Sequence, residues 1–509
     1  MRNKDLLQFT NSSPAHSHRA YVNSAVRFHH RFTREERLRI CKQIGWNVFK
    51  FPAEMTIGDF LSDSGTTTPT IEQLSASLLG DEAYGTNWGY IQLLKQFENV
   101  FGIEFSEYKR TLLVQKKKKT RSDQSEWEPY LFHQCRAGEH ALFAQIGRGR
   151  TGLIIPSNGH FDTTHANIEA NGITALDIPV QSENFIEGSL EYRFKGNMDL
   201  VALEELLSEQ GDRIPLVYCT ITNNTNAGQP VSLANMRGVK KLCERYQKPF
   251  FLDVCRFAEN SWYIKHYEPG YVNKPIKEIV HEVFSLCDGF TISLKKDGLS
   301  NMGGALCIKK RSALFKNYPE ILRDLRVHQI TTEGHDTYGG ISGRDIMIIA
   351  SGLPVVITEE YLNDRIGQVR KLGEYMDSLG LPVVKPFGGH AVYLDVDKFY
   401  EGTRMHREDF GGIALTGLLL LDGPRACELG AFAFGHYDKP TDTEILPPFN
   451  YVRIAIPRMK YEEPDLLFTA DCIKHLHNMR EDIPRAVPVY GRDIPLRHFS
   501  AQFELVKRR

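Results

Sequence analysis

Two lysines, an aspartate and an arginine stand where predicted strands end. The apolar run 287–292 predicts a buried strand, and Lys295 and Lys296 follow it closely. A second apolar run ends in Asp253, and Arg256 stands three residues further on. A lysine at a strand end can hold an aldehyde cofactor as a Schiff base. Together with the acid and the arginine, it makes a pattern typical of a pyridoxal 5′-phosphate (PLP) site.

Each of these residues has a definite expected role. Asp253 would pair with the protonated pyridine nitrogen, which keeps the ring an electron sink, and Arg256 would face the phenolate oxygen of the ring. The alternatives are that the two lysines lie on a solvated surface and that Asp253 only caps a helix or turn. The occurrence of both segments in one chain favours the cofactor site.

Further residues could hold other parts of the cofactor. Arg136 lies where a helix is expected to begin, and an arginine beside helix N–H groups suits a phosphate. Ser293, three residues before Lys296, adds a hydroxyl group. Phe161 could stack on the cofactor ring, or it could be an ordinary core phenylalanine.

An arginine and a polar turn are candidates for contact with a substrate. Arg453 lies in an apolar strand, where a buried guanidinium needs an anionic partner. The α-carboxylate of an amino acid, held by two hydrogen bonds, would fit, and an internal salt bridge is the alternative. The polar segment 223–230 follows a strand and is either a plain turn or a source of hydrogen bonds to cofactor and substrate.

The pattern from about residue 130 to 350 alternates short apolar runs with helical segments. This alternation predicts an α/β fold with a mostly parallel sheet, in which ligands bind at the carboxyl ends of the strands. Strands are expected at 152–156, 215–221, 249–254, 289–293 and 304–309, and helices at 136–147, 197–210, 232–247 and 311–318.

The rest of the chain is expected to form an N-terminal arm and a second domain. Residues 1–20 are polar and predict an arm. Residues 67–350 would be the large PLP-binding domain, and 21–66 together with 351–509 a smaller α+β domain. The charged segment 104–128, with its four consecutive lysines, is expected to be an insertion that forms either a solvated loop or a basic contact site.

Composition excludes several classes of partner. The 62 basic residues nearly balance the 63 acidic ones, which gives no reason to expect nucleic acid or an anionic membrane as a partner. The sequence contains no apolar run of the roughly 20 residues that a membrane helix needs and no apolar signal core. The nine cysteines lack CxxC pairing, so we expect buried thiols in a reducing, cytoplasmic compartment and no zinc site.

The assembled motifs resemble those of the β-eliminating lyases of aromatic amino acids, tryptophanase and tyrosine phenol-lyase. The resemblance runs from about residue 50 to the C-terminus, and the ordered set is far more specific than any one motif. The motifs read SDSGT, GDEAY, HQCRAGE, FDTT, NNTNAGQPVS, DVCRFAEN, SLKKDGLSNMGG, GGHAVYLD, VRIAIPR and LRHFSA.

The resemblance implies a fold type I PLP-dependent enzyme of the aspartate aminotransferase type, with a seven-stranded sheet. It implies that Lys296 holds the cofactor, with Lys295 beside it, and it supports the roles given above to Asp253, Arg256 and Phe161. The matching phosphate-binding residues are Gln134, Cys135, Arg136 and Ser293. The residues that match the substrate carboxylate region are Ser62, Ser64, Asn224 and Arg453.

The family also implies a monovalent cation and shared active sites. The cation, usually potassium, would be bound by Glu82 and by the backbone carbonyls of Gly65 and Asn301. Tyr84 would protonate the leaving ring carbon from a neighbouring subunit. The expected assembly is a homotetramer built from dimers, acting on a small amino acid.

Three positions bear on which aromatic ring leaves. At all three, this chain carries the kind of residue found in tryptophanases. Asp162 stands where the phenol-lyases have threonine, the apolar Leu429 where they have arginine, and His498 where they have phenylalanine. These positions favour release of indole from L-tryptophan, with Asp162 and His498 assisting catalysis.

Some features depart from the family pattern. Cys135 and Ala137 interrupt the glycines of the phosphate motif, and the 104–128 insertion is atypical. Tyrosine phenol-lyase, another β-lyase and a non-catalytic scaffold paralogue therefore stay open as alternatives.

Overall fold

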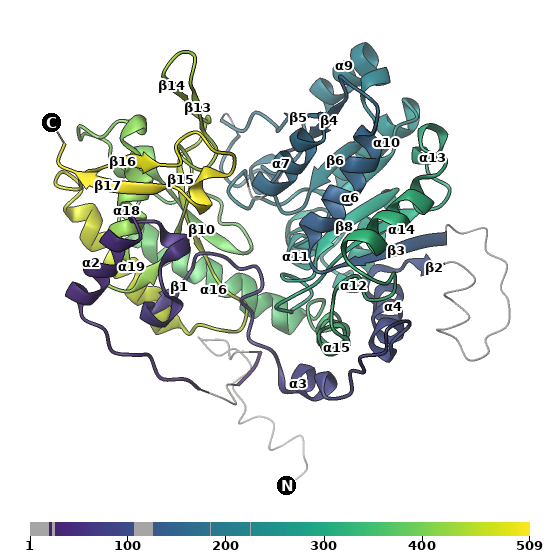
Figure 1. The fold of residues 1–509 in the computed structure, drawn as a ribbon, viewed down its shortest axis with the longest axis horizontal. Helices are drawn as coiled ribbons and strands as arrows, with labels where there is room; N and C mark the ends of the chain where they lie inside the picture. The colour runs from purple at the N-terminus through teal and green to yellow at the C-terminus, as the bar shows by residue number, and fades with distance from the viewer. Residues whose placement is uncertain (1–19, 23–25, 106–125, 184, 224, 509) are drawn as a thin grey trace, which may run out of the picture.

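The computed structural model describes most of the chain in two connected parts (Figure 1). The expected N-terminal arm lies almost wholly outside the described residues, as does most of the 104–128 segment. The residues described are 20–22, 26–105, 126–183, 185–223 and 225–508.

The first part is built around one sheet, which has eight strands among the described residues. Their order is β2-β3-β9-β8-β7-β6-β4-β5. The strands are β2 (Glu104–Phe105), β3 (Glu126–Phe132), β4 (Ile154–Ser157), β5 (Thr174–Asp177), β6 (Val217–Thr220), β7 (Phe250–Asp253), β8 (Gly289–Ser293) and β9 (Gly304–Lys309).

The α/β class with a mostly parallel sheet is confirmed. Strands β8, β7, β6, β4 and β5 run parallel, and β9 is antiparallel to β8 and β3. The sheet has one strand more than the seven expected. Two of the eight strands lie at the ends of the 104–128 segment, where β2 and the start of β3 pair in parallel. Those ends belong to the sheet, which corrects the expectation of a loop throughout.

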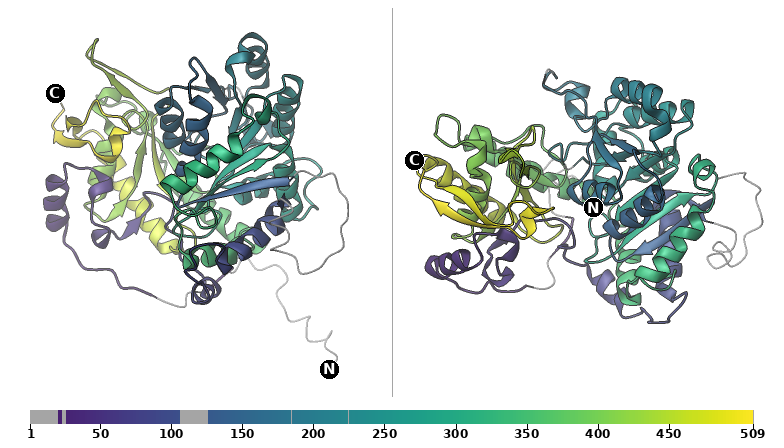
Figure 2. Two further views of the ribbon diagram at one scale, coloured as in Figure 1. Left: turned by 45° about the vertical axis from the view of Figure 1, so that its right-hand side comes forward. Right: turned by 45° about the horizontal axis from the view of Figure 1, so that its top comes forward.

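Helices cover both faces of this sheet (Figure 2). Alternate side chains of one strand enter different cores, as Phe250 and Phe251 of β7 do. The helices on the Phe251 face are α6 (Cys135–Gly147), α7 (Asp162–Ala170), α13 (Leu314–Asn317) and α14 (Ile321–Thr332). Those that contribute to the Phe250 core are α4 (Trp88–Phe101), α9 (Leu200–Gln210), α10 (Leu233–Arg245), α11 (Phe257–Tyr267), α12 (Ile276–Leu286) and α15 (Gly343–Gly352).

The second part has its own core, to which both ends of the chain contribute. Side chains from Cys41 to Phe60 pack there with side chains from the C-terminal third. The elements are α2 (Arg34–Gln43), β10 (Ala391–Asp395), α17 (Val396–Phe399), α18 (Gly411–Leu419), β12 (Cys427–Leu429), β15 (Tyr451–Ala455), α19 (Glu463–Asn478), β16 (Arg485–Tyr490) and β17 (Gln502–Val506).

Helix α16 (Glu359–Ser378) joins the two parts. Leu362 and Ile366, near its start, pack in the core of the large sheet, while Val369 and Leu372 pack in the second core. One helix therefore contributes to both cores, and it lies between the two parts in Figure 1.

A buried charged cluster ties distant segments together behind the strand ends. The guanidinium of Arg458 donates to Asp63 (3.0 Å), Glu259 (2.7 Å) and Asp297 (2.9 Å). Arg365 of α16 donates to the same Glu259 oxygen at 2.9 Å. All these side chains are almost completely inaccessible to solvent. Burial alone would lower the pKa of Arg458, but the three carboxylates hold it well above its ordinary value.

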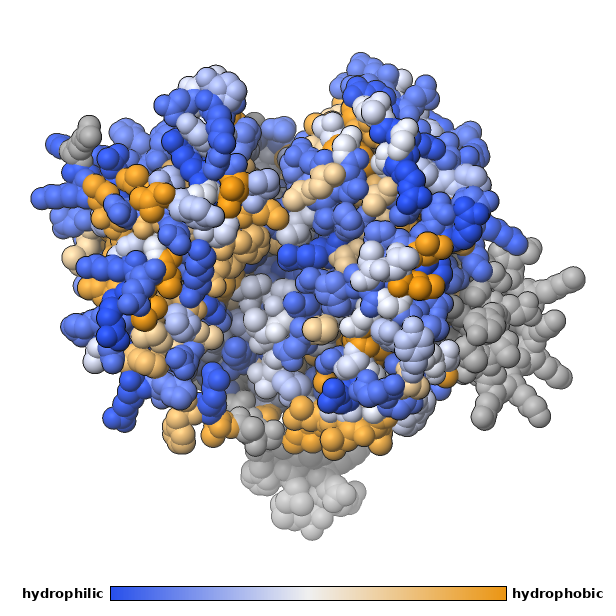
Figure 3. Space-filling view, viewed as in Figure 1, coloured by the Kyte–Doolittle hydropathy of each residue, from blue (hydrophilic) through white to orange (hydrophobic). Residues whose placement is uncertain are grey.

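The surface is mixed, and an apolar region lies over α3 (Ile71–Ser77). Ile71 and three exposed leucines gather there, along the lower edge of the view in Figure 3. Leu78, directly after the helix, has 86% of its surface exposed. Within the described residues, no helix combines the length and the apolar character needed to cross a membrane.

We expect Arg458→Met to lower the free energy of unfolding by about 3–5 kcal/mol, because it takes the paired guanidinium from buried Asp297 and one of two such partners from Asp63 and Glu259. Urea titration followed by circular dichroism measures the change. The matched control is Arg323→Met, which removes an exposed arginine paired with Glu320 and should cost less than about 1 kcal/mol. Equal losses in the two variants would contradict a structural role for the buried cluster.

Candidate active site

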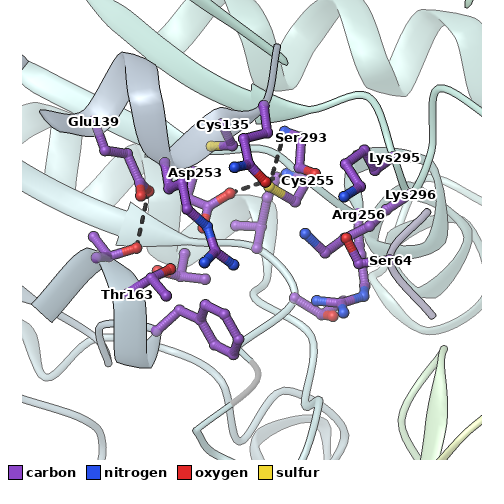
Figure 4. Close-up of a pocket in the computed structure, with 17 residues that line it drawn as sticks. Ser64, Cys135, Glu139, Thr163, Asp253, Cys255, Arg256, Ser293, Lys295 and Lys296 are labelled. Carbon is purple, nitrogen blue, oxygen red and sulfur yellow. Dashed lines mark hydrogen bonds between the residues drawn. The ribbon is translucent and has the colours of Figure 1, made fainter. Parts of the chain in front are cut away.

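A cavity opens at the carboxyl ends of β7 and β8, between the starts of α6 and α7. Its volume is about 560 Å³, including its open mouth. The lysines lie on one side of it and Glu139 and Thr163 on the other, as Figure 4 shows. The lining residues are Ser64, Gln134, Cys135, Arg136, Glu139, Phe161, Thr163, Thr164, Thr220, Ile221, Thr222, Asp253, Cys255, Arg256, Ser293, Lys295 and Lys296.

Both lysines of the pair line the cavity. They follow β8, and the backbone N–H of Lys296 donates to the carbonyl of Ser293 at 3.3 Å, which begins a tight turn. The next residue, Asp297, belongs to the buried charged cluster and also accepts a hydrogen bond from the N–H of Ala258 (2.8 Å). Burial, Lys296 and Arg136 together lower the pKa of Lys295. The turn that carries Lys296 is therefore fixed by the residue beside it.

Asp253 and Arg256 lie at the end of the neighbouring strand. One carboxylate oxygen of Asp253 accepts the N–H of Cys255 at 3.1 Å. The Arg256 guanidinium forms two hydrogen bonds with Asp63, of 3.0 and 2.7 Å. Burial alone would raise the pKa of Asp63, but Arg256 and other nearby cations hold it well below its usual range. Asp63 therefore orients Arg256 at the cavity wall.

The start of α6 forms the end of the cavity where a phosphate was expected. Gln134 is the residue before the helix and makes no side-chain capping bond, and Cys135 and Arg136 begin the first turn. Strand β9 approaches this turn very closely, because a Cβ atom at Gly304 would lie 2.3 Å from the backbone nitrogen of Cys135. Gly304 is therefore needed to seat the helix start against the sheet.

A polar group that sequence reasoning missed lines the opposite wall. Glu139 of α6 is buried and accepts hydrogen bonds from Thr164 (2.8 Å) and Tyr218 (3.3 Å). Burial and the charge of Asp253 raise the pKa of Glu139 to about 7. The signal was present in the HQCRAGE motif, since an acid one turn after Cys135 falls on the same face of the helix.

Asp162 and His498 come together from opposite ends of the chain. Both are buried, and His498 Nε2 lies 3.4 Å from a carboxylate oxygen of Asp162. Neither lines the cavity directly, although Phe161, the residue before Asp162, does.

The residues expected near the substrate carboxylate lie in different places. Arg453 is buried in β15 and donates to the carbonyl of Leu61 at 2.9 Å. Ser64 lines the cavity, and its N–H donates to the hydroxyl of Ser62 at 3.1 Å. Asn224 lies outside the described residues.

The expected cation ligands and Tyr84 lie apart from the cavity lining. The side-chain amide of Asn301 donates to the carbonyl of Gly65 at 2.9 Å, so these two residues do meet. The carboxylate of Glu82 instead pairs with Arg344. Tyr84 has 75% of its surface exposed and packs edge-on against His335. One chain alone brings neither Glu82 nor Tyr84 into the cavity lining.

Comparison with known proteins gives a clear family assignment. A family model described as "Beta-eliminating lyase" matches residues 59–471. The chain belongs to the beta-eliminating lyase family. It is therefore a lyase, and the resemblance found in the motifs is confirmed.

Curated relatives of this lyase are similar over nearly their whole length. A tryptophanase of Hyphomonas neptunium is 40% identical over 93% of this chain and 95% of its own length. A probable beta-eliminating lyase of Trichomonas vaginalis is 37% identical over 93% and 96%. A tyrosine phenol-lyase of Symbiobacterium thermophilum is 34% identical over 93% and 95%.

Solved structures share the fold of this lyase at much lower sequence identity. A threonine aldolase of Leishmania major is 14% identical with a TM-score of 0.52, over 82% of this chain and 99% of its own. A serine palmitoyltransferase of S. paucimobilis, solved with a bound PLP–myriocin adduct, is 9% identical with a TM-score of 0.52, over 83% and 88%. The likeness confirms the expected fold type.

We expect Glu139→Gln to change how stability depends on pH. An ordinary glutamate has a pKa of 4.5, and Glu139 has one of about 7 in the folded chain. Because the folded state binds this proton more tightly, wild-type stability falls as pH rises from about 4.5 to about 7. The variant lacks this loss, so its melting temperature minus that of the wild type should increase between pH 5 and pH 8.

Thermal unfolding of the cofactor-free full-length chain measures this difference. The control is Glu278→Gln, which changes an exposed glutamate on α12. Its difference from the wild type should stay nearly constant over the same range. Parallel curves for Glu139→Gln and the wild type would show that Glu139 is not held protonated in the fold.

Proposed function

We propose that this chain is a PLP-dependent lyase that converts L-tryptophan to indole, pyruvate and ammonia. The observation that carries the proposal is that Lys296, Asp253 and Arg136 line one cavity, from two adjacent strand ends and a helix start. A lysine for the aldehyde, an acid for the ring nitrogen and a basic helix start for the phosphate match the three functional groups of this cofactor.

The residues present fit the cofactor. The uncapped first turn of α6 supports an anion site, because its N–H groups lack a side-chain acceptor from Gln134. Arg136 and Ser293 border the same end of the cavity, and Phe161 offers a ring on its wall. When bound, PLP supplies an electron sink that stabilises negative charge at the α-carbon of the substrate. Arg256, oriented by Asp63, would face the ring oxygen.

Lys296 has a second role as a base. With substrate in the cavity, the free Nζ atom of Lys296 would take the α-proton. Lys295 and Arg136 line the same cavity and place positive charge near this amine. Arg453, Ser62, Ser64 and Asn224 would hold the substrate carboxylate.

Release of indole needs a proton at the ring carbon, and two features support its delivery. Asp162 and His498 form a buried polar pair behind Phe161, which suits a proton relay or the orientation of the indole ring. The exposed Tyr84 is available to a second copy of the chain. We propose that Tyr84 enters the cavity of a neighbouring subunit in a homotetramer.

Leu429 supports indole rather than phenol as the leaving group. It is buried in an apolar cluster with Ala227 and Tyr393, so at this position the chain offers no charged partner to a phenolic oxygen. The similarity to tryptophanases supports the same choice. Phenol-lyase activity is the second candidate, because curated phenol-lyases are also similar to this chain.

A potassium ion would complete the assembly. The carbonyls of Gly65 and Asn301 are hard oxygen ligands, and Gly65 lies directly after the loop that carries Ser64. Glu82 of a second copy would supply the charge. The exposed apolar residues around α3 support contact between copies on this side.

We expect Lys296→Ala to lower pyruvate release from L-tryptophan by at least about 10³-fold, since both the covalent attachment and the base are lost. A coupled assay for pyruvate together with direct measurement of indole tests this. Lys316→Ala, which changes an exposed lysine on α13, should keep wild-type rates. Normal turnover in Lys296→Ala would refute the assignment.

Selectivity between the two aromatic substrates is a separate test. We expect kcat/KM for indole release from L-tryptophan to exceed that for phenol release from L-tyrosine by about 100-fold, because Leu429 offers no hydrogen-bond partner to a phenolic hydroxyl. His498→Phe should reduce the first value and spare the second. A preference for tyrosine in the wild type would move the chain to the phenol-lyases.

A further inference from the structure

We propose that Cys135, Asp253 and Cys255 form a binding site for a thiophilic divalent cation of the zinc class. One sulfur atom from each cysteine and one carboxylate oxygen of Asp253 lie within 4.8 Å of one another. Two thiolates and a carboxylate at such spacing are a donor set that Zn²⁺ prefers. The sequence predicted no zinc site, because no CxxC pair marks these two distant cysteines.

Three elements of the fold bring the donors together. Cys135 is the first residue of α6, Asp253 ends β7, and Cys255 follows in the turn that leads to α11. Figure 4 shows the three side chains next to one another on the wall of the cavity. The close approach of β9 at Gly304 fixes the start of α6 and with it Cys135, while Asp253 is held at the end of a central strand.

Hydrogen bonds from the backbone already orient two of the donors. The N–H of Ser293 donates to the sulfur of Cys255 at 3.1 Å, and the N–H of Cys255 donates to Asp253 at 3.1 Å. N–H donation to a thiolate reduces its charge, and such outer contacts fix ligands before a metal arrives. Two of the three donors, Cys255 and Asp253, therefore already have supporting hydrogen bonds.

Burial and access also suit a metal. Cys135, Asp253 and Cys255 have 8%, 5% and 6% of their surface exposed, yet all three border the open cavity. A cation would enter through the cavity mouth and displace two thiol protons to solvent. Three protein ligands would leave a fourth coordination position directed at the cavity, where water or another donor could bind.

The cation and the cofactor would exclude each other. This step rests on the proposed function, in which Asp253 pairs with the pyridine nitrogen of PLP. A metal held by Asp253 would occupy that carboxylate, so the metal-loaded chain could not take up cofactor in the proposed position. The metal site by itself requires only the geometry of the three donors.

Cobalt titration tests the site directly. The full-length chain, freed of cofactor and kept reduced with a phosphine, is titrated with Co²⁺ under anaerobic conditions. We expect thiolate-to-cobalt charge-transfer absorption that saturates at one ion per chain, with the visible bands of tetrahedral cobalt. Zn²⁺ added afterwards should remove these bands by displacement. Absence of charge-transfer absorption in the wild type would overturn the proposal.

Variants identify the donors. Cys135→Ser and Cys255→Ser should each weaken cobalt binding by more than about 100-fold, since loss even of an outer-shell partner costs about 10–100-fold. The matched control is Cys243→Ala, which removes a buried thiol of α10 and should leave the absorption unchanged. Thermal unfolding of each sample checks that it is folded. Absorption that persists in both serine variants would refute these ligands.

Competition separates this inference from the proposed function. Chain loaded with PLP beforehand should show no charge-transfer absorption, and chain loaded with Zn²⁺ should take up PLP at least tenfold more slowly. If cobalt binds equally with and without PLP, mutual exclusion is wrong. If PLP does not bind at all while cobalt does, the proposed function fails and the metal site stands.

Discussion

The buried contacts of Arg458 are the constraint on which the other features of the site depend. Its guanidinium meets three carboxylates from a loop near the N-terminus, from α11 and from the turn after β8. An unpaired charge in this position would be very costly, so these segments must assemble together. Asp297 directly follows Lys296, and Asp63 forms two hydrogen bonds with Arg256. The same cluster therefore fixes the positions of the lysine and the arginine in the cavity.

The charges of the cavity follow from this arrangement. Lys295, Lys296, Arg136 and Arg256 face a wall that carries Asp253 and Glu139. Clustered cations in a recess attract an anionic phosphate and a substrate carboxylate. Burial and the charge of Asp253 raise the pKa of Glu139 to about 7. Its protonated and ionised forms are therefore both populated near neutral pH. The thiols of Cys135 and Cys255 also line this cavity. One cavity therefore contains both the residues proposed to bind the cofactor and those proposed to bind a metal ion.

The local sequence pattern was enough to predict the central strands of the large sheet, but not the strands near its edges. Strands β8 and β9 have the bounds expected from their apolar runs, because both faces of each strand are buried. Strand β5 was missed because its side chains are partly or fully exposed, and β3 because Pro129 and charged residues interrupt its apolar pattern. Glu139 and Asp63 were missed as parts of the site because their partners, Tyr218 and Arg256, lie on other elements.

The sequence by itself determined the α/β class, the strand ends that carry Asp253 and Lys296, and the family, since each depends on short runs or ordered motifs. Only the tertiary structure decided which distant side chains meet. Arg458 and Asp63 are 395 residues apart, and Cys135 reaches Cys255 only through the seating of α6 on the sheet. The periodicity of apolar residues specifies which face of its own helix or strand a side chain occupies. Which elements then touch is decided by the packing of the whole core.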